Sequence, residues 1–440
     1  MAVLTVPDMF KRIQDAIDKW QKGDVVRVAQ GNYVENLRLR PGVILEGGFK
    51  KDFSAQNWKQ WPSVVDGNKQ GSVVVGADGC QLNGFTLRNG KARNGGGVFL
   101  EKAAMTIKNN TIEDNVAEYS GGGLYIAEYP GTTQTGMYLD IQNNVFRKNE
   151  AAGYKGGFGG GIFVTNSHAG IRVNDNVIGG PLGDGNKAKW GGGGICVEFT
   201  PIIDIVENEI SQNISYAHGG GVEINGGSGN SSLIGNNIHY NLAYGHYGGG
   251  AYVIGGTFIS KNSIMGNRID NFTLGRGGGI AVSCLEHSCP VLENNFINKN
   301  FADYGAGIHI DRGDRILIIN NSVAFNRANP DLQAGGGVHI EDGLIVLQNN
   351  ILWGNKDDLK VVKGSRILIH NDIEDGDDFG KLGNITSDPK FFDQENLHIT
   401  SASGAINAGD PKGGPKDDID GERRSPTTPD IGADEFIDKK

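Results

Sequence analysis

Ionisable and aromatic side chains recur at one position of a phrase that this chain repeats. The phrase is a glycine-rich triplet followed by an apolar residue, a variable residue and a second apolar residue. Successive copies begin 26 to 38 residues apart between Gly95 and Gly335. In chain order the variable residue is Phe99, Tyr125, Phe163, Cys196, Glu223, Tyr252, Ala281, His309 and His339. Imidazole exchanges protons near neutral pH and carboxylates serve as general acids or bases, so this position is a candidate for proton transfer.

Side-chain alternation predicts where these residues point. In a strand, neighbouring side chains lie on opposite faces, so the two apolar residues face the core and the variable residue faces outward. If the copies pair as strands about 4.8 Å apart, the variable residues form one row, which we call the variable column. Its rings suit the flat apolar faces of sugar units; the alternative is that they pack under the loops that follow each strand. Because Ala281 is small, we expect a gap for a sugar between Tyr252 and His309.

Two pairs of carboxylates have spacings that suggest chemistry. Glu198 lies beside the variable column, one copy before Glu223, so their backbones should be roughly 8 Å apart. An inverting glycosidase needs its acid and base about 6.5 to 9.5 Å apart. Asp311 and Glu341 would be about 5 Å apart and would repel unless a proton or a cation lies between them. We expect Ca²⁺ there, held also by Asp342, with two solvated carboxylates as the alternative; no organic cofactor is expected.

The residues just before the glycine triplets are rich in rings and cations. They include Lys189, Trp190, Tyr216, His218, Tyr244, His246, Tyr247, Arg276 and Tyr304. Such a set could border a groove beside the variable column and bind a polysaccharide. The alternative is that these side chains only cover the bends where they occur.

A second phrase predicts the elements that position these residues. It begins and ends with asparagine and has an apolar residue between, as from Asn110 to Asn115. The segments around it have apolar residues at alternate positions and are too short for helices. Repeats of about 30 residues with such strands predict a parallel β-solenoid. Asparagine tolerates left-handed backbone angles at sharp turns, and stacked asparagines can form ladders of amide hydrogen bonds.

The repeats continue smoothly and predict one all-β domain of about 10 to 12 coils. The strand edges at the two ends of a solenoid need covers. We expect an amino-terminal cap over residues 1–25, with an amphipathic helix over residues 8–20. Residues 26–375 are predicted to form the solenoid, and the proline-rich residues 376–440 an irregular carboxy-terminal cap packed on it.

Composition limits the partners and the compartment. The formal net charge of −10 over 440 residues argues against nucleic acid or an anionic membrane as the main partner. No stretch of about 18 apolar residues is present to span a membrane. The first residues do not form a signal peptide; we expect a removed secretory signal and a secreted or cell-surface monomer. Cys284 and Cys289 could form a disulfide, whereas Cys80 and Cys196 are expected to be inert packing residues.

Three features together resemble the right-handed parallel β-helix proteins of the pectate-lyase-like superfamily. They are the opening RIQDAIDKWQKGDVVRVAQGNYVENLRLRPGVILEGGF, the two repeated phrases, and the ending with SDPKFFD, SASGAINAGDP and DIGADEF. The resemblance covers nearly the whole chain and implies a right-handed parallel β-helix. Members include polysaccharide lyases, glycoside hydrolases, sugar epimerases and non-catalytic surface proteins, so the fold does not choose the function.

The cationic and imidazole groups, taken with this analogy, favour a lyase that cleaves a uronic-acid polysaccharide by β-elimination. Tyr252, His309 or His339 would take the proton, and Arg276 or Arg312 would stabilise the developing enolate. One alternative is inverting hydrolysis by the glutamate pair described above. A second alternative is a non-catalytic, glycan-binding or cell-surface solenoid.

Overall fold

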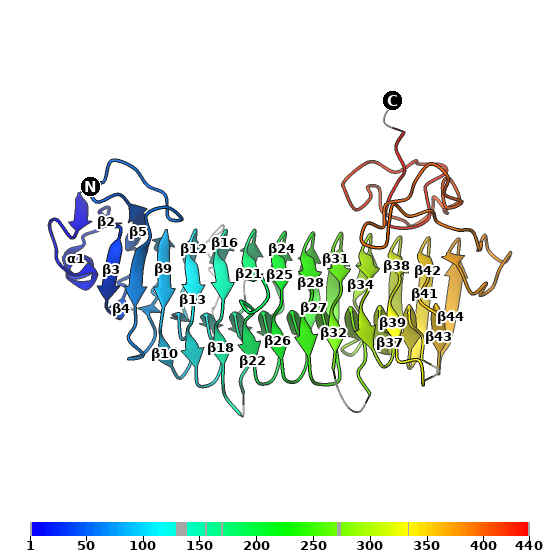
Figure 1. Cartoon of the computed structure of the whole chain (residues 1–440), viewed down its shortest axis with the longest axis horizontal. Helices are drawn as coiled ribbons and strands as arrows, with labels where there is room; N and C mark the ends of the chain where they lie inside the picture. Colours follow the sequence, from blue (N-terminus) through cyan, green and yellow to red (C-terminus); the bar gives the residue numbers. More distant parts are fainter. Residues whose placement is uncertain are drawn as a thin grey trace. The chain divides into compact units, whose positions relative to one another are not determined.

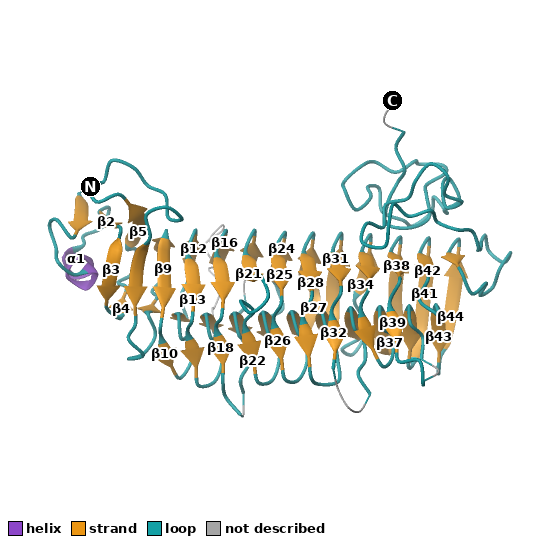
Figure 2. Ribbon diagram, in the orientation of Figure 1, coloured by secondary structure: helices purple, strands orange, loops and turns teal. Residues whose placement is uncertain are grey.

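A computed structural model describes residues 2–128, 139–154, 156–168, 170–270, 274–332 and 334–438. The chain divides into two compact units, Met1–Ser215 and Tyr216–Lys440, which we call the amino-terminal and carboxy-terminal units. Each unit is a stack of short strands, and the one helix of the described residues lies near the amino terminus (Figures 1 and 2). The strands of each unit form three sheets of parallel strands, which gives the predicted parallel solenoid in both.

The amino-terminal unit begins with a strand and a helix, α1 (Ile13–Lys19). Its first sheet contains β1 (Val3–Val6), β2 (Val25–Ala29), β4 (Leu37–Arg38), β5 (Ile44–Phe49), β7 (Val74–Val75), β8 (Cys80–Asn83), β11 (Val98–Glu101), β12 (Met105–Lys108), β15 (Leu124–Ala127), β16 (Leu139–Gln142), β19 (Ile162–Thr165), β20 (Ile171–Asn174), β23 (Ile195–Glu198) and β24 (Ile203–Val206). The second contains β3 (Gly31–Val34), β6 (Ser63–Asp66), β9 (Phe85–Arg88), β13 (Thr111–Glu113), β17 (Val145–Arg147), β21 (Val177–Gly179) and β25 (Glu209–Ser211). The third contains β10 (Lys91–Ala92), β14 (Val116–Ala117), β18 (Glu150–Ala151), β22 (Lys187–Ala188) and β26 (Ile214–Ser215).

The carboxy-terminal unit repeats the same plan with longer strands in its first sheet. These are β27 (Val222–Ile234), β30 (Ala251–Ser260), β33 (Ile280–Ser283), β34 (Val291–Glu293), β37 (Ile308–Ile319), β40 (Val338–Ile340), β41 (Gly343–Gln348), β43 (Leu359–Val361) and β44 (Ser365–Ile369). The second sheet contains β28 (Asn237–His239), β31 (Ser263–Met265), β35 (Phe296–Asn298), β38 (Ser322–Ala324), β42 (Ile351–Trp353) and β45 (Asp372–Ile373). The third contains β29 (Leu242–Ala243), β32 (Arg268–Ile269), β36 (Phe301–Ala302) and β39 (Arg327–Ala328).

Buried asparagines form two ladders in each unit, which confirms the predicted amide stacking. In the amino-terminal unit they are Asn110, Asn144, Asn176 and Asn208, and Asn115, Asn149, Asn186 and Asn213. In the carboxy-terminal unit they are Asn236, Asn262, Asn295, Asn321, Asn350, Asn371 and Asn384, and Asn241, Asn267, Asn300, Asn326 and Asn355.

Each rung of a ladder uses the whole amide group. Asn300 Nδ2 donates to Asn326 Oδ1 and to the carbonyl of Ile264, both at 2.9 Å. Its Oδ1 accepts from the backbone N–H of Asn267 at 2.9 Å and from Asn267 Nδ2 at 3.1 Å. Asn300 is fully buried, so these contacts supply all the partners that its amide needs.

The expectation that the ladder asparagines carry the left-handed backbone is wrong. The positive φ angles fall one residue earlier, as at Asn109 (56°), Asn143 (52°) and Lys299 (56°). The ladder position therefore requires the asparagine amide for hydrogen bonding, while the residue before it makes the turn.

The glycine triplets mark a corner at which backbones approach closely. Gly305 has a φ of 55°, and a Cβ there would lie 2.4 Å from the carbonyl oxygen of Ile308. A Cβ at Gly279 would lie 2.7 Å from the carbonyl oxygen of Gly307 and 2.8 Å from Asn300 Nδ2. Real Cβ atoms do not fit at such distances, so the corner excludes side chains, as the sequence predicted.

Helix α1 is shorter than the predicted span of residues 8–20. It buries Ile13, Ala16 and Ile17, and the Glu35 carboxylate accepts hydrogen bonds from the backbone N–H groups of Ile13 (2.9 Å) and Gln14 (3.1 Å). Strand β1 precedes the helix and pairs with β2, which the sequence pattern did not indicate. A carboxylate at the first turn satisfies free N–H groups and favours this start of the helix.

Residues 376–438 pack as irregular loops on the strands of the carboxy-terminal unit (Figure 2). Leu397 and Ala433 are buried against Phe296 and Ala324. Asn320 Nδ2 donates to the carbonyl of Gly432 at 3.1 Å, and Ser322 Oγ accepts from the backbone N–H of Ala433 at 3.1 Å. The segment is thus held by apolar burial and by hydrogen bonds to the outer side of the turns.

We predict that Asn300→Ala strongly destabilises the carboxy-terminal unit. The substitution leaves the buried backbone N–H of Asn267 without a partner and also removes three other hydrogen bonds of the Asn300 amide, to Asn267 Nδ2, Asn326 Oδ1 and the carbonyl of Ile264. A buried group that loses its partner costs about 1–3 kcal/mol, and each further lost hydrogen bond costs about 1 kcal/mol. The expected loss of unfolding free energy is at least about 3 kcal/mol, measured by urea denaturation. Asn237→Ala, on the exposed side of β28, is the control and should cost less than about 1 kcal/mol. Equal losses in the two variants would contradict this role of the ladder.

Candidate functional site

The predicted variable column exists in each unit. In the carboxy-terminal unit, Glu223 pairs with Tyr252, Tyr252 with Ala281, Ala281 with His309, and His309 with His339. In the amino-terminal unit the same pairing joins Phe99, Tyr125, Phe163 and Cys196. The column is the outer face of the first sheet, because the flanking apolar residues are buried on the other face.

The column is covered by the residues that directly precede the glycine triplets. The ring of Tyr247 lies 5.0 Å from that of Tyr252 and 6.2 Å from that of His309. The ring of Tyr304 meets that of His339 edge-on at 5.4 Å, and the ring of His218 lies 5.5 Å from that of Tyr252. These covering side chains reach back over the strand because the first glycine of the triplet makes a sharp bend.

The expected gap at Ala281 is wrong. Ala281 is fully buried, and the ring of Tyr247 stacks on Tyr252 on one side of it and meets His309 at a tilt of 53° on the other. A small residue in the column therefore makes room for a covering ring. The sequence did not reveal this because the ring comes from the corner before the preceding copy of the phrase.

A chain of hydrogen bonds links Arg276, Tyr247 and Asp311 at this cover. Arg276 Nη1 donates to the Tyr247 hydroxyl at 2.9 Å, and the hydroxyl donates to Asp311 Oδ1 at 3.2 Å. The guanidinium also lies over the Tyr247 ring, 5.5 Å from its centre. Burial, and then the charge of Asp311, raises the pKa of Tyr247, so its phenol is a proton donor at neutral pH.

The two histidines of the column are stacked and buried. Their rings lie 5.3 Å apart, His309 is fully buried, and His339 is 2% exposed. Burial, the charge of His339 and that of Arg276 hold the pKa of His309 well below its usual value. Burial also lowers the pKa of His339, although Glu341 lies 3.4 Å from its Nε2. Both imidazoles are therefore neutral at pH 7, but neither presents a nitrogen to solvent.

Among the other predicted catalytic residues, Tyr252 is half-buried and Arg312 is exposed. Burial raises the pKa of Tyr252, so its phenol stays protonated at neutral pH and does not act as a base. The sequence pattern predicted that Asp311 would pair with Ser283, but a bulge in β37 places Arg312 opposite Ser283 instead. The extra residue of a bulge shifts every later side chain by one position.

The predicted metal ligands contact protein partners. Asp311 accepts from Tyr247, Glu341 contacts His339, and Asp342 pairs with Lys363 at 3.1 Å. In the part of the chain that the structure describes, three His, Asp or Glu ligand atoms converge within 4.8 Å elsewhere, at His398, Asp420 and Asp434. Calcium binding at the predicted ligands stays a prediction.

The two glutamates of the hydrolase hypothesis belong to different units. Glu198 ends β23 in the amino-terminal unit, where burial raises the pKa of its carboxyl. Glu223 lies in β27 of the carboxy-terminal unit and is 5% exposed. A raised pKa suits a general acid, whereas the role of the pair in catalysis stays a prediction.

Several of the predicted substrate-binding residues are exposed. In the carboxy-terminal unit Tyr216 and Tyr244 are 46% and 41% exposed and stack with their ring centres 5.4 Å apart; His246 beside them is also exposed. In the amino-terminal unit Trp190 is 45% exposed, and Lys189 before it is half-buried. In each unit these residues follow strands of the third sheet, and we call this place in each unit its aromatic corner.

The amino-terminal unit has two further exposed rings at the same corner, which the sequence analysis missed. Tyr119 is 42% exposed and lies under the guanidinium of Arg93, 5.1 Å from it. Tyr154 is 89% exposed, and its carbonyl accepts a hydrogen bond from Trp190 Nε1 at 2.8 Å. The signal that could have revealed them is their position shortly after a third-sheet strand: Tyr119 lies two residues after the end of β14, and Tyr154 three residues after the end of β18.

The cysteines behave as predicted. Cys284 and Cys289 form a disulfide, and Cys80 and Cys196 are buried and are not bonded to another cysteine. The disulfide closes the loop that follows β33.

Comparison with known protein families agrees with this architecture. The family model of the right-handed β-helix region matches residues 31–199 and 193–373, so the chain belongs to the right-handed β-helix family. No curated protein matches the chain. Within the described residues, the structure has no helix that is long and apolar enough to cross a membrane. The predicted fold class is confirmed.

Burial of His218 predicts a loss of stability in acid. Burial, and then the charge of His246, lowers the pKa of His218 to about 4. Between about pH 6.5 and pH 4 the unfolded chain therefore binds a proton that the folded chain does not. As the pH is lowered through this range, the free energy of unfolding decreases by up to about 1.4 kcal/mol per pH unit. His218→Phe should flatten this part of the profile of urea unfolding against pH. His287→Phe, at an exposed histidine, is the control; an unchanged slope in His218→Phe would contradict the assignment.

Proposed function

We propose that the protein is a carbohydrate-binding β-helix protein that holds a polysaccharide at the aromatic corner. The observation that carries this proposal is the pair Tyr216 and Tyr244, whose rings stack at 5.4 Å while each remains more than 40% exposed. Exposed rings at this density cost solvation energy and mark a contact surface. Tyrosine suits a sugar because its ring contacts apolar C–H faces and its hydroxyl bonds to sugar hydroxyls.

The spacing of the coils supports an extended ligand. The ring centres of Tyr216 and Tyr244 lie 5.4 Å apart, close to the spacing of about 4.8 Å between neighbouring parallel strands. In the amino-terminal unit the rings of Tyr119, Tyr154 and Trp190 provide a similar surface. A row of rings with a period close to that of a sugar unit can contact several units of one chain.

The net charge supports a ligand other than nucleic acid, and the disulfide supports a location outside the cytoplasm. The net charge of −10 does not favour nucleic acid, and local cations such as Arg93 lie against the exposed rings. The Cys284–Cys289 disulfide is typical of an oxidising environment and supports secretion or display at the cell surface.

We predict that removing the two rings weakens glycan binding. Each exposed ring contributes about 1 kcal/mol, so the Tyr216→Ala, Tyr244→Ala double variant should bind the best polysaccharide of a panel roughly 30-fold more weakly. Isothermal titration calorimetry measures this change. Tyr240→Ala is the matched control, because Tyr240 is 47% exposed but lies after β28, away from this corner. Unchanged binding in the double variant, or binding to no polysaccharide by the wild type, would refute the proposal.

A second candidate function, β-elimination on a uronic-acid polysaccharide, is favoured by the Arg276, Tyr247 and Asp311 chain. A guanidinium can neutralise the carboxylate of the sugar, which makes the adjacent C–H acidic. A neutral phenol held by that guanidinium can give its proton to the leaving oxygen. This arrangement unites an acid and a neutralising cation in one half-buried place.

The proton acceptors of this second candidate are less well placed. His309 and His339 are buried, and the raised pKa of Tyr252 keeps its phenol protonated. A general base must reach the proton that it abstracts. The structure therefore supports glycan binding better than β-elimination, because the exposed rings can reach a polysaccharide and the proton acceptors cannot.

The hydroxyl of Tyr247 distinguishes the two candidates. Tyr247→Phe keeps the covering ring and removes the proton donor, so a lyase should lose at least about 100-fold in kcat, whereas glycan affinity should stay unchanged. Ultraviolet absorbance of unsaturated uronates measures the first quantity, and calorimetry the second. Tyr240→Phe is the control. Reducing ends without unsaturated product, lost in Glu223→Gln, would instead select hydrolysis.

A further inference from the structure

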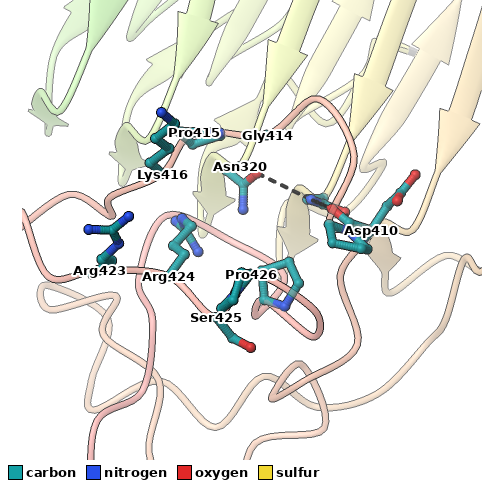
Figure 3. A pocket seen from close by; sticks show the side chains of 12 residues that line it. Asn320, Asp410, Gly414, Pro415, Lys416, Arg423, Arg424, Ser425 and Pro426 are labelled. Carbon is teal, nitrogen blue, oxygen red and sulfur yellow. Dashed lines mark hydrogen bonds between the residues drawn. The ribbon is translucent and has the colours of Figure 1, made fainter.

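A pocket of about 290 Å³ lies between the carboxy-terminal segment and the turns of the carboxy-terminal unit (Figure 3). Asn320 and Asn349 lie at its solenoid side, and residues from Asp410 to Pro429 form its other walls. Its size is close to the lower end of natural ligand pockets, which are about 300–1,000 Å³, and suits one sugar unit.

The pocket is cationic although the chain is acidic. Lys416, Arg423 and Arg424 line it, and Asp410 is the one acidic residue of its lining (Figure 3). The backbone holds the three cations together. The N–H of Arg424 donates to the carbonyl of Lys416 at 2.9 Å, and the backbone of Arg423 pairs with that of Asp417 in an isolated antiparallel β-bridge. Lys416 and Arg423 are exposed, so they reach a ligand at the mouth of the pocket.

Arg424 is a fixed cation beneath these two. It is 5% exposed, and its Nη2 donates to Asn294 Oδ1 and to the carbonyl of Gly432, both at 2.9 Å. Its Nη1 lies 3.4 Å from Glu435 Oε2, and Asp418, Asp430 and Asp434 also act on its charge, so the positive charge that the pocket offers to a ligand comes from Lys416 and Arg423. Its buried Nε has no hydrogen-bond partner among the described residues, so the guanidinium retains one donor without an acceptor.

The remaining walls are apolar and rigid. Pro411, Pro415, Pro426 and Pro429 line the pocket. Proline has a fixed φ and no N–H, so these walls change little when a ligand binds and offer C–H surface to it. The amides of Asn320 and Asn349 already donate to backbone carbonyls of Gly432 and Asp410, which leaves the cations as the groups that select a ligand.

We propose that this pocket binds one carboxylated sugar unit, a hexuronate, with its carboxylate between Lys416 and Arg423 and its ring against the prolines. Arginine and lysine pair strongly with carboxylates, and arginine adds a planar pair of donors that matches the two oxygens. The site is separate from the aromatic corner and does not depend on glycan binding there.

Ligand-observed NMR titration of the full chain with D-glucuronate tests the proposal. We expect a Kd of about 1 mM, as for a small ligand with few polar anchors. The Lys416→Ala, Arg423→Ala double variant should bind at least tenfold more weakly, and Arg423→Lys should retain part of the affinity. Lys390→Ala is the matched control, because Lys390 is an exposed lysine of the same segment outside the pocket.

Two other ligands and one other variant complete the test. D-glucose should bind at least tenfold more weakly than D-glucuronate, and sulfate should bind more weakly because it cannot contact the prolines. Equal binding of glucose or sulfate, absent glucuronate binding, or an unaffected double variant would overturn the proposal. The Tyr216→Ala, Tyr244→Ala variant should keep its glucuronate affinity, so failure of the corner and failure of the pocket give different results.

Discussion

The structure depends on one constraint: the side-chain amide of each ladder asparagine is buried, and its hydrogen-bond partners lie in the neighbouring coils. Asn300 shows the requirement in full, because its donors and acceptor contact Asn267, Asn326 and Ile264. A coil that slipped by one residue would lose these contacts and would also turn its apolar side chains to the wrong face. The ladders therefore fix the register of every strand, and the register decides which side chains form a row.

The bend at the glycine triplets determines how much of that row is exposed to solvent. Because the chain bends sharply at residues such as Gly305, the side chain before the bend folds over the variable column. Tyr247 in this way covers Ala281 and contacts Tyr252 and His309. The same geometry that brings imidazoles and phenols together also removes them from water, which lowers the pKa of His309 and raises that of Tyr252. Chemically capable side chains are thus used largely for packing, and the accessible rings lie one corner away.

The carboxy-terminal segment changes a repeating surface into a unique one. Every coil of a solenoid offers nearly the same outer face, so a row of rings suits a repeating ligand and not a single small one. Residues 376–438 add prolines, cations and carboxylates whose positions do not repeat from coil to coil. Arg424 is tied to Asn294 and Gly432 and anchors this segment to the turns beneath it. Sites for single small ligands are therefore more readily built here than on the bare solenoid.

The sequence by itself determined the fold. Periodic glycines, asparagines and alternating apolar residues specify parallel coils, and they predicted the amide ladders and the variable column. The short spacing of Cys284 and Cys289 separately indicated a disulfide, which the structure contains. These features are local or repeat at a fixed spacing, so they can be read along the chain. Tertiary structure alone decided which members of the column reach water, because covers such as Tyr247 over His309 join residues about two coils apart. It also decided the bulge at Asp311 and the pocket at Arg424. The physical reason is that burial and electrostatics depend on every neighbour in space, whereas a repeat pattern records only the neighbours along the chain.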